Sequence, residues 1–334
     1  MATKTRKPAA PRRPRTKKTA APVRRAGLSV NRFLTIAQLT SADCERIFRE
    51  SEALKTARRT GRATPLLAGR ILAGVFEKSS TRTRVSFESA MTQLGGTMQV
   101  LHGRDLQLGR GESIADTARV LSRYVDGIAI RTDAQSKDVE MARHAPVPVI
   151  NALTDYSHPC QALADLFTLR ERFGRLKGLR LAYIGDGNNV ARSLVFAAAK
   201  TGVQLAVASP EAYALDRQTV ELSEAARVAS GGDLYLSHDP TRAATQADAV
   251  YTDVWASMGQ EQEQAARVKA FKRFQITARL MELAAPHALF MHCLPAHRGE
   301  EVAAEVIDGP RSIVFDQAEN RLHVQKGILS LLLG

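Results

Sequence analysis

Short apolar runs alternate with helical patterns along most of the chain. The runs have the length of buried strands and fall at residues 70–76, 98–102, 128–130, 147–153, 179–184, 204–208, 233–236, 249–254 and 288–293. Strands that alternate with helices are typical of parallel sheets, in which each helix crosses over from one strand to the next. The sequence therefore predicts an α/β fold with mainly parallel sheets.

The strands fall into two series, which a long helix starting near Pro159 separates. Proline suits the first position of a helix, and 334 residues exceed the length at which one core usually stops growing. We therefore expect two α/β domains, over residues 28–160 and 161–317, with a cleft between them. A C-terminal helix over residues 318–334 should complete the first domain.

The basic charge of the chain is concentrated at its start. The net charge is +13, but residues 1–25 contain ten lysines and arginines and no acid, which leaves about +3 for the rest. With four prolines and few apolar residues, residues 1–27 are predicted to form a disordered basic tail. A solvated extension, a mitochondrial transit peptide and a polyanion-binding segment all remain open. The tail lacks the apolar region of a secretory signal.

The cysteine content and the hydropathy of the chain indicate the cellular compartment in which the protein is expected. Cys44, Cys160 and Cys293 are widely spaced and form no Cys-x-x-Cys motif, which argues against a disulfide framework or a zinc finger. The longest apolar stretches are far shorter than the roughly 20 residues that span a bilayer. We expect a soluble cytoplasmic protein without a membrane partner, or a protein of the mitochondrial matrix if the tail is a transit peptide.

The segment Ser80-Thr-Arg-Thr-Arg84 joins the strand at residues 70–76 to a helix. The first N–H groups of a helix lack internal partners and lie at the positive end of its dipole, so this turn suits an anion. Ser80, Thr81 and Thr83 add hydroxyl donors, and Arg82 adds a guanidinium that matches a phosphate. The alternative is a plain helix cap with solvated arginines, but five such residues in succession favour phosphate binding.

Other polar residues also follow predicted strands. They are Arg131, His158-Pro-Cys-Gln161, Gly185-Asp-Gly-Asn-Asn189, Asp253-Val-Trp-Ala-Ser-Met-Gly259 and His292-Cys-Leu-Pro-Ala296. Ligands of open parallel sheets bind at the carboxyl ends of the strands. These groups should therefore converge on one cleft between the domains.

Together these motifs resemble those of the ornithine carbamoyltransferases, from about Leu28 to the C-terminus. The resemblance implies transfer of a carbamoyl group from carbamoyl phosphate to L-ornithine, giving L-citrulline and phosphate without a metal or an organic cofactor. It further implies arginine biosynthesis and a homotrimer. Residues 28–160 would bind carbamoyl phosphate and residues 161–317 ornithine.

The resemblance also implies roles at the carbamoyl phosphate end of the site. Ser80, Thr81, Arg82 and Thr83 would hold the phosphate, and Arg321 would reach it from the last helix. Arg131 and His158, with Thr83, would polarise the carbonyl. Gln161 and the backbone carbonyl of Leu294 would hold the carbamoyl amine, and Cys293 would also contact carbamoyl phosphate. A lone histidine is more often a packed or surface residue, but its place before the proline-started helix favours a functional role for His158.

At the ornithine end, Asn189, Asp253, Ser257 and Met258 would bind the α-amino and α-carboxylate groups. The side-chain amine must lose a proton before it attacks, because an ammonium with a pKa of about 10 has no lone pair. Cys293 and Asp253 are the candidates for this region, although Cys293 alone could equally be a buried core thiol. Where relatives can supply a lysine from a neighbouring subunit, this chain has Arg110, to which we assign no role.

The sequence is also compatible with other functions. Gly185-Asp-Gly187 follows a strand, but position 190 is valine and no acid ends the next strand, which argues against a dinucleotide site. A nucleic-acid-binding protein that uses the basic tail would leave the strand-end residues unexplained, so we do not expect a nucleic-acid partner. A transcarbamoylase for putrescine or acetylornithine is the nearest alternative, and a catabolic role is another.

Overall fold

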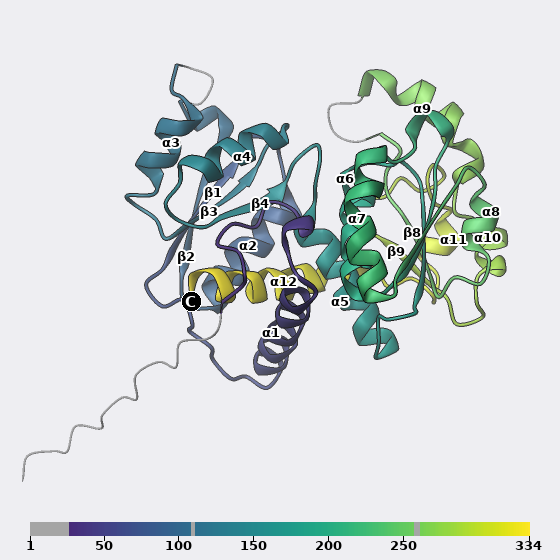
Figure 1. Ribbon diagram of the computed structural model, residues 1–334, viewed down its shortest axis with the longest axis horizontal. Helices are drawn as coiled ribbons and strands as arrows, with labels where there is room; N and C mark the ends of the chain where they lie inside the picture. The colour runs from purple at the N-terminus through teal and green to yellow at the C-terminus, as the bar shows by residue number, and fades with distance from the viewer. Residues whose placement is uncertain (1–26, 108–110, 257–260) are drawn as a thin grey trace, which may run out of the picture.

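Two parallel sheets, each with helices on both faces, form the two lobes of the molecule (Figure 1). The computed structural model describes residues 27–107, 111–256 and 261–334. This arrangement confirms the fold class expected from the alternation of strands and helices.

The first lobe contains a four-stranded sheet in the order β2-β1-β3-β4. Its elements are α1 (Ser41–Arg59), β1 (Ile71–Phe76), α2 (Thr81–Gln93), β2 (Thr97–His102), α3 (Ile114–Leu121), β3 (Gly127–Arg131), α4 (Gln135–His144) and β4 (Val149–Leu153). Alternate side chains of β1 face opposite sides: Leu72 joins the core beneath α1, α2 and α12, whereas Ala73 and Val75 join the core beneath α3 and α4. Both faces of the sheet are therefore covered.

The second lobe contains a five-stranded sheet in the order β7-β6-β5-β8-β9. Its elements are β5 (Arg180–Ile184), α6 (Asn189–Thr201), β6 (Gln204–Ala208), α7 (Arg217–Ser230), β7 (Asp233–Ser237), α8 (Pro240–Ala244), β8 (Ala249–Thr252), α9 (Gln264–Phe271), α10 (Ala278–Leu283), β9 (Leu289–His292) and α11 (Ala304–Ile307). All neighbouring strands in the two sheets are parallel.

Two helices tie the lobes together. Helix α5 (Pro159–Phe173) lies between the sheets, and α12 (Val314–Leu333) runs from the second lobe back across the first, where it packs on α1, α2 and α5 (Figure 1). One continuous core includes side chains from both sheets and both helices, for example Leu72, Leu163, Tyr251 and Leu329. The lobes are thus joined by packing as well as by the chain.

Some strand and helix boundaries differ from the expected ones. Helix α3 ends at Leu121, and the carboxylate of Asp126 accepts a hydrogen bond from the backbone of Ile71 at the sheet (2.9 Å). Strand β8 ends at Thr252, because the carboxylate of Asp253 accepts the N–H of Val254 (2.8 Å) and turns the chain. Helix α12 begins at Val314, four residues before the apolar pattern indicated.

Within these described ranges, we find no helix that has both the length and the apolar character needed to cross a bilayer. Residues 1–26 lie outside the described residues, so the predicted disorder of the tail stays a prediction.

Candidate active site

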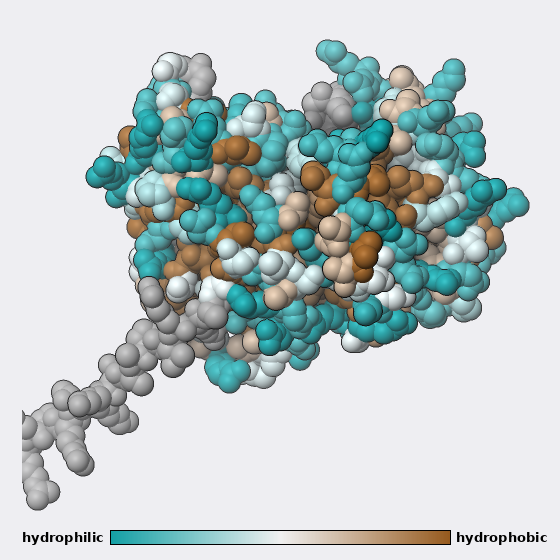
Figure 2. All heavy atoms as spheres, viewed as in Figure 1, coloured by the Kyte–Doolittle hydropathy of each residue, from teal (hydrophilic) through white to brown (hydrophobic). Residues whose placement is uncertain are grey.

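A cavity of about 780 Å³ lies between the two lobes. In the space-filling view the outline of the molecule dips between them (Figure 2). Residues from both lobes line the cavity, and they include Ser80, Thr81, Arg82, Thr83, Arg131, His158, Gln161, Asn189, Asp253, Cys293, Leu294 and Arg321. The polar strand ends therefore do converge, as the parallel topology predicted.

Thr83 is the centre of the anion-binding end. It lies in the first turn of α2 and is fully buried, and its Oγ1 accepts hydrogen bonds from Arg131 Nη1 (3.1 Å) and Arg321 Nη2 (2.7 Å). Ser80 holds the N-cap position of α2, but its hydroxyl makes no capping bond within the described part of the chain. The hydroxyls and N–H groups of this turn are therefore available to a ligand.

Three guanidinium groups gather around this turn without a compensating carboxylate. Arg82, Arg131 and Arg321 form no ion pair with any acid of the described residues. Burial lowers the pKa of Arg131 to about 10, and the charges of Arg321 and Arg82 add to this effect. Burial likewise lowers the pKa of Arg321. The repulsion among the buried Arg131 and Arg321 and the exposed Arg82 favours binding of a dianion such as a phosphate.

His158 and Gln161 flank the start of α5. His158 is buried, and burial together with Arg321, Arg131 and Arg82 lowers its pKa well below the usual range. The imidazole is therefore neutral near pH 7 and can donate a single N–H hydrogen bond to a ligand. The backbone N–H of His158 donates to Ser193 Oγ in α6 (2.8 Å), which fixes this corner to the second lobe.

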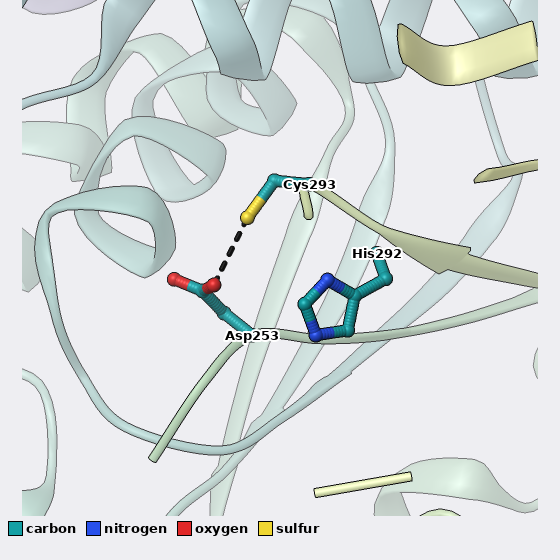
Figure 3. A group of neighbouring side chains, drawn as sticks. All are labelled: Asp253, His292 and Cys293. Atoms are coloured by element: carbon teal, nitrogen blue, oxygen red, sulfur yellow. Dashed lines mark hydrogen bonds between the residues drawn. The ribbon is translucent and has the colours of Figure 1, made fainter. Parts of the chain in front are cut away.

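The opposite end of the cavity holds a carboxylate and a thiol. The thiol of Cys293 donates a hydrogen bond to Asp253 Oδ1 (2.9 Å), and the two side chains point toward one another from the ends of β9 and β8 (Figure 3). Asn188 Nδ2 donates to Asp253 Oδ2 (2.9 Å), and Asn189 Nδ2 donates to the carbonyl of Thr154 (2.6 Å). The N–H of Val254 also donates to Asp253 Oδ1, so the carboxylate accepts hydrogen bonds from three residues at the edge of the sheet.

Cys293 is a thiol rather than a thiolate in this environment. Burial raises its pKa well above the usual range, and the neighbouring charge of Asp253 raises it further. The sulfur therefore keeps its proton near pH 7. Of this pair, the carboxylate is the group that can take a proton from an amine.

The loop that follows β9 is held by a buried histidine and a buried glutamate. His292 Nε2 lies 3.1 Å from Glu301 Oε1, and His292 Nδ1 accepts the N–H of Leu294 (2.8 Å). Leu294 has a φ of 59°, a conformation that costs free energy for a residue with a side chain. The histidine therefore helps to hold the strained residue whose carbonyl the resemblance assigned to the carbamoyl amine.

Asp253, His292 and Cys293 each offer an atom within 4.8 Å of the others, the spacing of a metal site. Both ring nitrogens of His292 are already engaged, by the Leu294 N–H and by Glu301. The ring is thus unavailable as a ligand, and this set does not fit a metal ion.

The sequence predicted no individual role for several residues of the site. Asn188 belongs to the Gly185-Asp-Gly-Asn-Asn189 motif, and a polar residue directly before a helix is a capping signal; it caps α6 and holds Asp253. Asp165, Gln317 and Glu301 are fully buried, and no local pattern marks a buried polar residue in a helix or a loop. Ser257, Met258 and Arg110 lie outside the described residues, so their assignments stay predictions.

The fold and the cavity define a class: a two-lobed parallel α/β protein that places an anion-binding helix start opposite a carboxylate and an amide. Residues 31–171 match the carbamoyl-P binding domain of the aspartate/ornithine carbamoyltransferases, and residues 177–332 match their Asp/Orn binding domain. The chain belongs to the aspartate/ornithine carbamoyltransferase family.

Relatives within the family are similar over nearly their whole length. An ornithine carbamoyltransferase of Carboxydothermus hydrogenoformans is 54% identical over 302 residues, 90% of this chain and 97% of the relative. An anabolic ornithine carbamoyltransferase of Pyrococcus furiosus is 52% identical over 303 residues, 90% of this chain and 96% of the relative. The solved structure of the ornithine carbamoyltransferase from Pyrococcus furiosus has a TM-score of 0.89 at 50% identity and covers 92% of this chain and 98% of its own.

Proposed function

We propose that the chain is an enzyme that transfers the carbamoyl group of carbamoyl phosphate to the side-chain amine of L-ornithine, giving L-citrulline and phosphate. The main support for this proposal is that one cavity has a cationic group of residues at one end and a carboxylate with a thiol at the other. Thr83 and three guanidinium groups form one end, and the Asp253 carboxylate with the Cys293 thiol forms the other. The first suits a phosphate dianion and the second a cationic amino acid.

At the first end, Ser80, Thr81, Arg82 and Thr83 bind the phosphate, and Arg321 neutralises its charge. Arg131 and the neutral His158, with Thr83, donate hydrogen bonds to the carbonyl oxygen, where negative charge develops as the amine attacks. The same cations stabilise the charge that grows on the departing phosphate. Gln161 and the carbonyl of Leu294 hold the carbamoyl amine.

At the second end, Asn189, Asp253, Ser257 and the backbone of Met258 bind the α-amino and α-carboxylate groups of ornithine. The side-chain ammonium must give up its proton before its nitrogen can attack the carbonyl carbon. Asp253 is the acceptor that the geometry favours, since the Cys293 thiol already donates to it. Cys293 then acts by fixing the carboxylate near the amine.

The test is citrulline formation by the purified protein with carbamoyl phosphate and four amines, offered side by side: ornithine, putrescine, acetylornithine and aspartate. We expect strong preference for ornithine. Preference for putrescine or acetylornithine would keep the phosphate site and overturn the ornithine assignment. If no amine reacts, the transferase function is wrong and binding of nucleic acid by the basic tail becomes the reading to test.

We also propose an anabolic role in arginine biosynthesis, a cytoplasmic location and a homotrimer. The anabolic role is supported by the name of the Pyrococcus furiosus relative. The trimer is supported by the resemblance to the family alone. Sedimentation of the purified protein tests the trimer, and the mass of a monomer would contradict it.

A further inference from the structure

The side-chain amide of Gln161 has one engaged end and one free end. Gln161 lies in the first turn of α5, is fully buried and borders the cavity. Its Nε2 donates a hydrogen bond to Asp165 Oδ1 (2.7 Å), one turn along the same helix. Its Oε1 is buried and has no partner among the described residues. A buried carbonyl oxygen without a donor is costly, which points to a ligand that supplies one.

The orientation of this amide is set by a chain of hydrogen bonds that starts at a backbone group. The N–H of His292 donates to Gln317 Oε1 (2.9 Å), so the other end of that amide, Nε2, is left to donate to Asp165 Oδ1 (2.7 Å). A backbone N–H cannot act as an acceptor, and this fixes the direction of every later bond. Oδ1 of Asp165 therefore accepts from Gln317, and it also accepts from Gln161 Nε2, which leaves the oxygen of Gln161 to point elsewhere.

The four residues of the chain come from three elements of both lobes. His292 ends β9, Gln317 is in α12, and Asp165 and Gln161 are in α5. All four are fully buried, so water does not compete for these bonds. Burial also raises the pKa of Asp165 to about 7, against the hydrogen bonds from the two glutamines. Oδ1 accepts both bonds whether or not a proton sits on the other oxygen.

We propose that Asp165 is a positioning residue that, through this chain, turns the Gln161 carbonyl towards the cavity, where it accepts an N–H of the carbamoyl group. This inference rests on the proposed function and names a consequence for substrate choice. Carbamoyl phosphate supplies the N–H donor, whereas acetyl phosphate carries a methyl group in its place. With acetyl phosphate the Gln161 oxygen stays unpaired, and a site built in this way discriminates strongly against such a ligand.

The experiment compares two constants for the wild-type enzyme and for Asp165→Leu. One is the KM for carbamoyl phosphate in citrulline formation, and the other is the inhibition constant of acetyl phosphate against it. We expect Asp165→Leu to raise the KM for carbamoyl phosphate by about tenfold or more, the value of one hydrogen bond, and to leave inhibition by acetyl phosphate nearly unchanged. Asp165→Asn keeps an acceptor oxygen and should preserve most of the discrimination.

The mechanism is tested by combining Asp165→Leu with Gln161→Met. If Asp165 acts through Gln161, Asp165→Leu should raise the KM for carbamoyl phosphate only slightly in a protein that already carries Gln161→Met. Independent, additive losses would overturn the proposal, as would an equal weakening of both ligands by Asp165→Leu alone. If Asp165→Leu does not fold, Gln317→Met interrupts the same chain and is read in the same way.

Asp43→Asn is the matched control, because Asp43 is also a buried acid but lies at the start of α1, away from the cavity. It should leave the ratio of the two constants unchanged. The failure of this inference is distinct from the failure of the proposed function. If only this inference fails, the wild-type enzyme makes citrulline, but substitution of Asp165 leaves the ratio of the acetyl phosphate inhibition constant to the KM for carbamoyl phosphate unchanged. If the proposed function fails, the wild-type protein makes no citrulline.

Discussion

Thr83 accepts hydrogen bonds from Arg131 and Arg321, two residues that lie far from it in the sequence. The hydroxyl thereby places both guanidinium groups beside the start of α2. Arg82 lies next to Thr83 on the chain and lines the same cavity, but it is exposed. This end of the site is thus a cluster of three cations, two of which are held in place by one threonine.

Arg82→Ala should weaken carbamoyl phosphate binding by about tenfold to a hundredfold, since a hydrogen bond to a charged group contributes about 1.5–3 kcal/mol. The matched control is Arg84→Ala on the same helix. Arg84 pairs with Glu88 (3.3 Å) and does not line the cavity, so its loss should leave the affinity nearly unchanged. The KM for carbamoyl phosphate measures both. Equal effects of the two changes would contradict the assignment of Arg82.

Helix α1 shows how one buried acid secures an element. The N–H of Asp43 donates to the Thr40 hydroxyl (3.1 Å), and the Asp43 carboxylate accepts the N–H of Thr40 (3.0 Å), so the two residues form a capping box. The same carboxylate also accepts from the hydroxyl and the N–H of Ser29. Burial by itself would raise the pKa of Asp43, but these hydrogen bonds outweigh it and lower the pKa to about 2.

Asp43→Asn should lower the free energy of unfolding by about 1–2 kcal/mol at pH 6, after allowance for solvent screening. The folded pKa of about 2 is below the ordinary value of 3.8. The stabilising effect is therefore complete above about pH 4 to 5 and is lost as the pH falls towards 2. Urea unfolding of both proteins between pH 6 and pH 3 should show the difference shrinking. A difference that grows on acidification would contradict the sign.

Helices α12 and α1 meet at a glycine. A Cβ on Gly327 would lie 2.5 Å from Ser51 Oγ and 3.0 Å from the carbonyl of Ile47, closer than atoms can approach without a shift. Ser51 Oγ itself donates to that carbonyl (2.7 Å), so it is not free to move away. The absence of a side chain at residue 327 is what allows the two helices to pack at this distance.

Gly327→Ala should destabilise the protein, because the steric clash costs about 1–3 kcal/mol. This cost should exceed the roughly 1 kcal/mol by which alanine is favoured over glycine in a helix. Thermal unfolding measures the change. Combining it with Ser51→Ala removes the oxygen nearest to the new methyl group and should restore part of the loss. A stabilised Gly327→Ala single variant would show that the helices do not approach as closely as described.

The cavity lies where the two lobes of the molecule meet. The residues that line the cavity fall between Lys78 and Arg321, and Arg321 reaches it because α12 crosses back over the first lobe (Figure 1). A continuous core beneath α5 and α12 supports both ends of the site.

Deletion of residues 1–26 should therefore leave citrulline formation unchanged, because the cavity and its supporting helices lie entirely after that segment. The rate of the truncated protein, measured beside that of the full chain at saturating substrates, tests this. A large loss of turnover would give the tail a catalytic role. Binding of nucleic acid by the full chain alone, weakened by salt, would instead identify the tail as a polyanion-binding segment.

Local patterns in the sequence predicted the strands, the helices and the polar turn at the start of α2, because each depends on residues within a few positions of one another. The rule that ligands bind at the carboxyl ends of parallel strands then brought Arg131, His158, Asp253 and Cys293 to one cavity. Both steps needed only the order of elements along the chain.

Only the tertiary structure decided how the polar groups are paired. Arg321 meets Thr83 across 238 residues, and Gln317 joins His292 to Asp165 across the two lobes. Buried hydrogen bonds of this kind have no local signature, because their partners come from different elements and are selected by packing. The sequence determined which groups are present at the site, and the fold determined which atoms of those groups face the substrate.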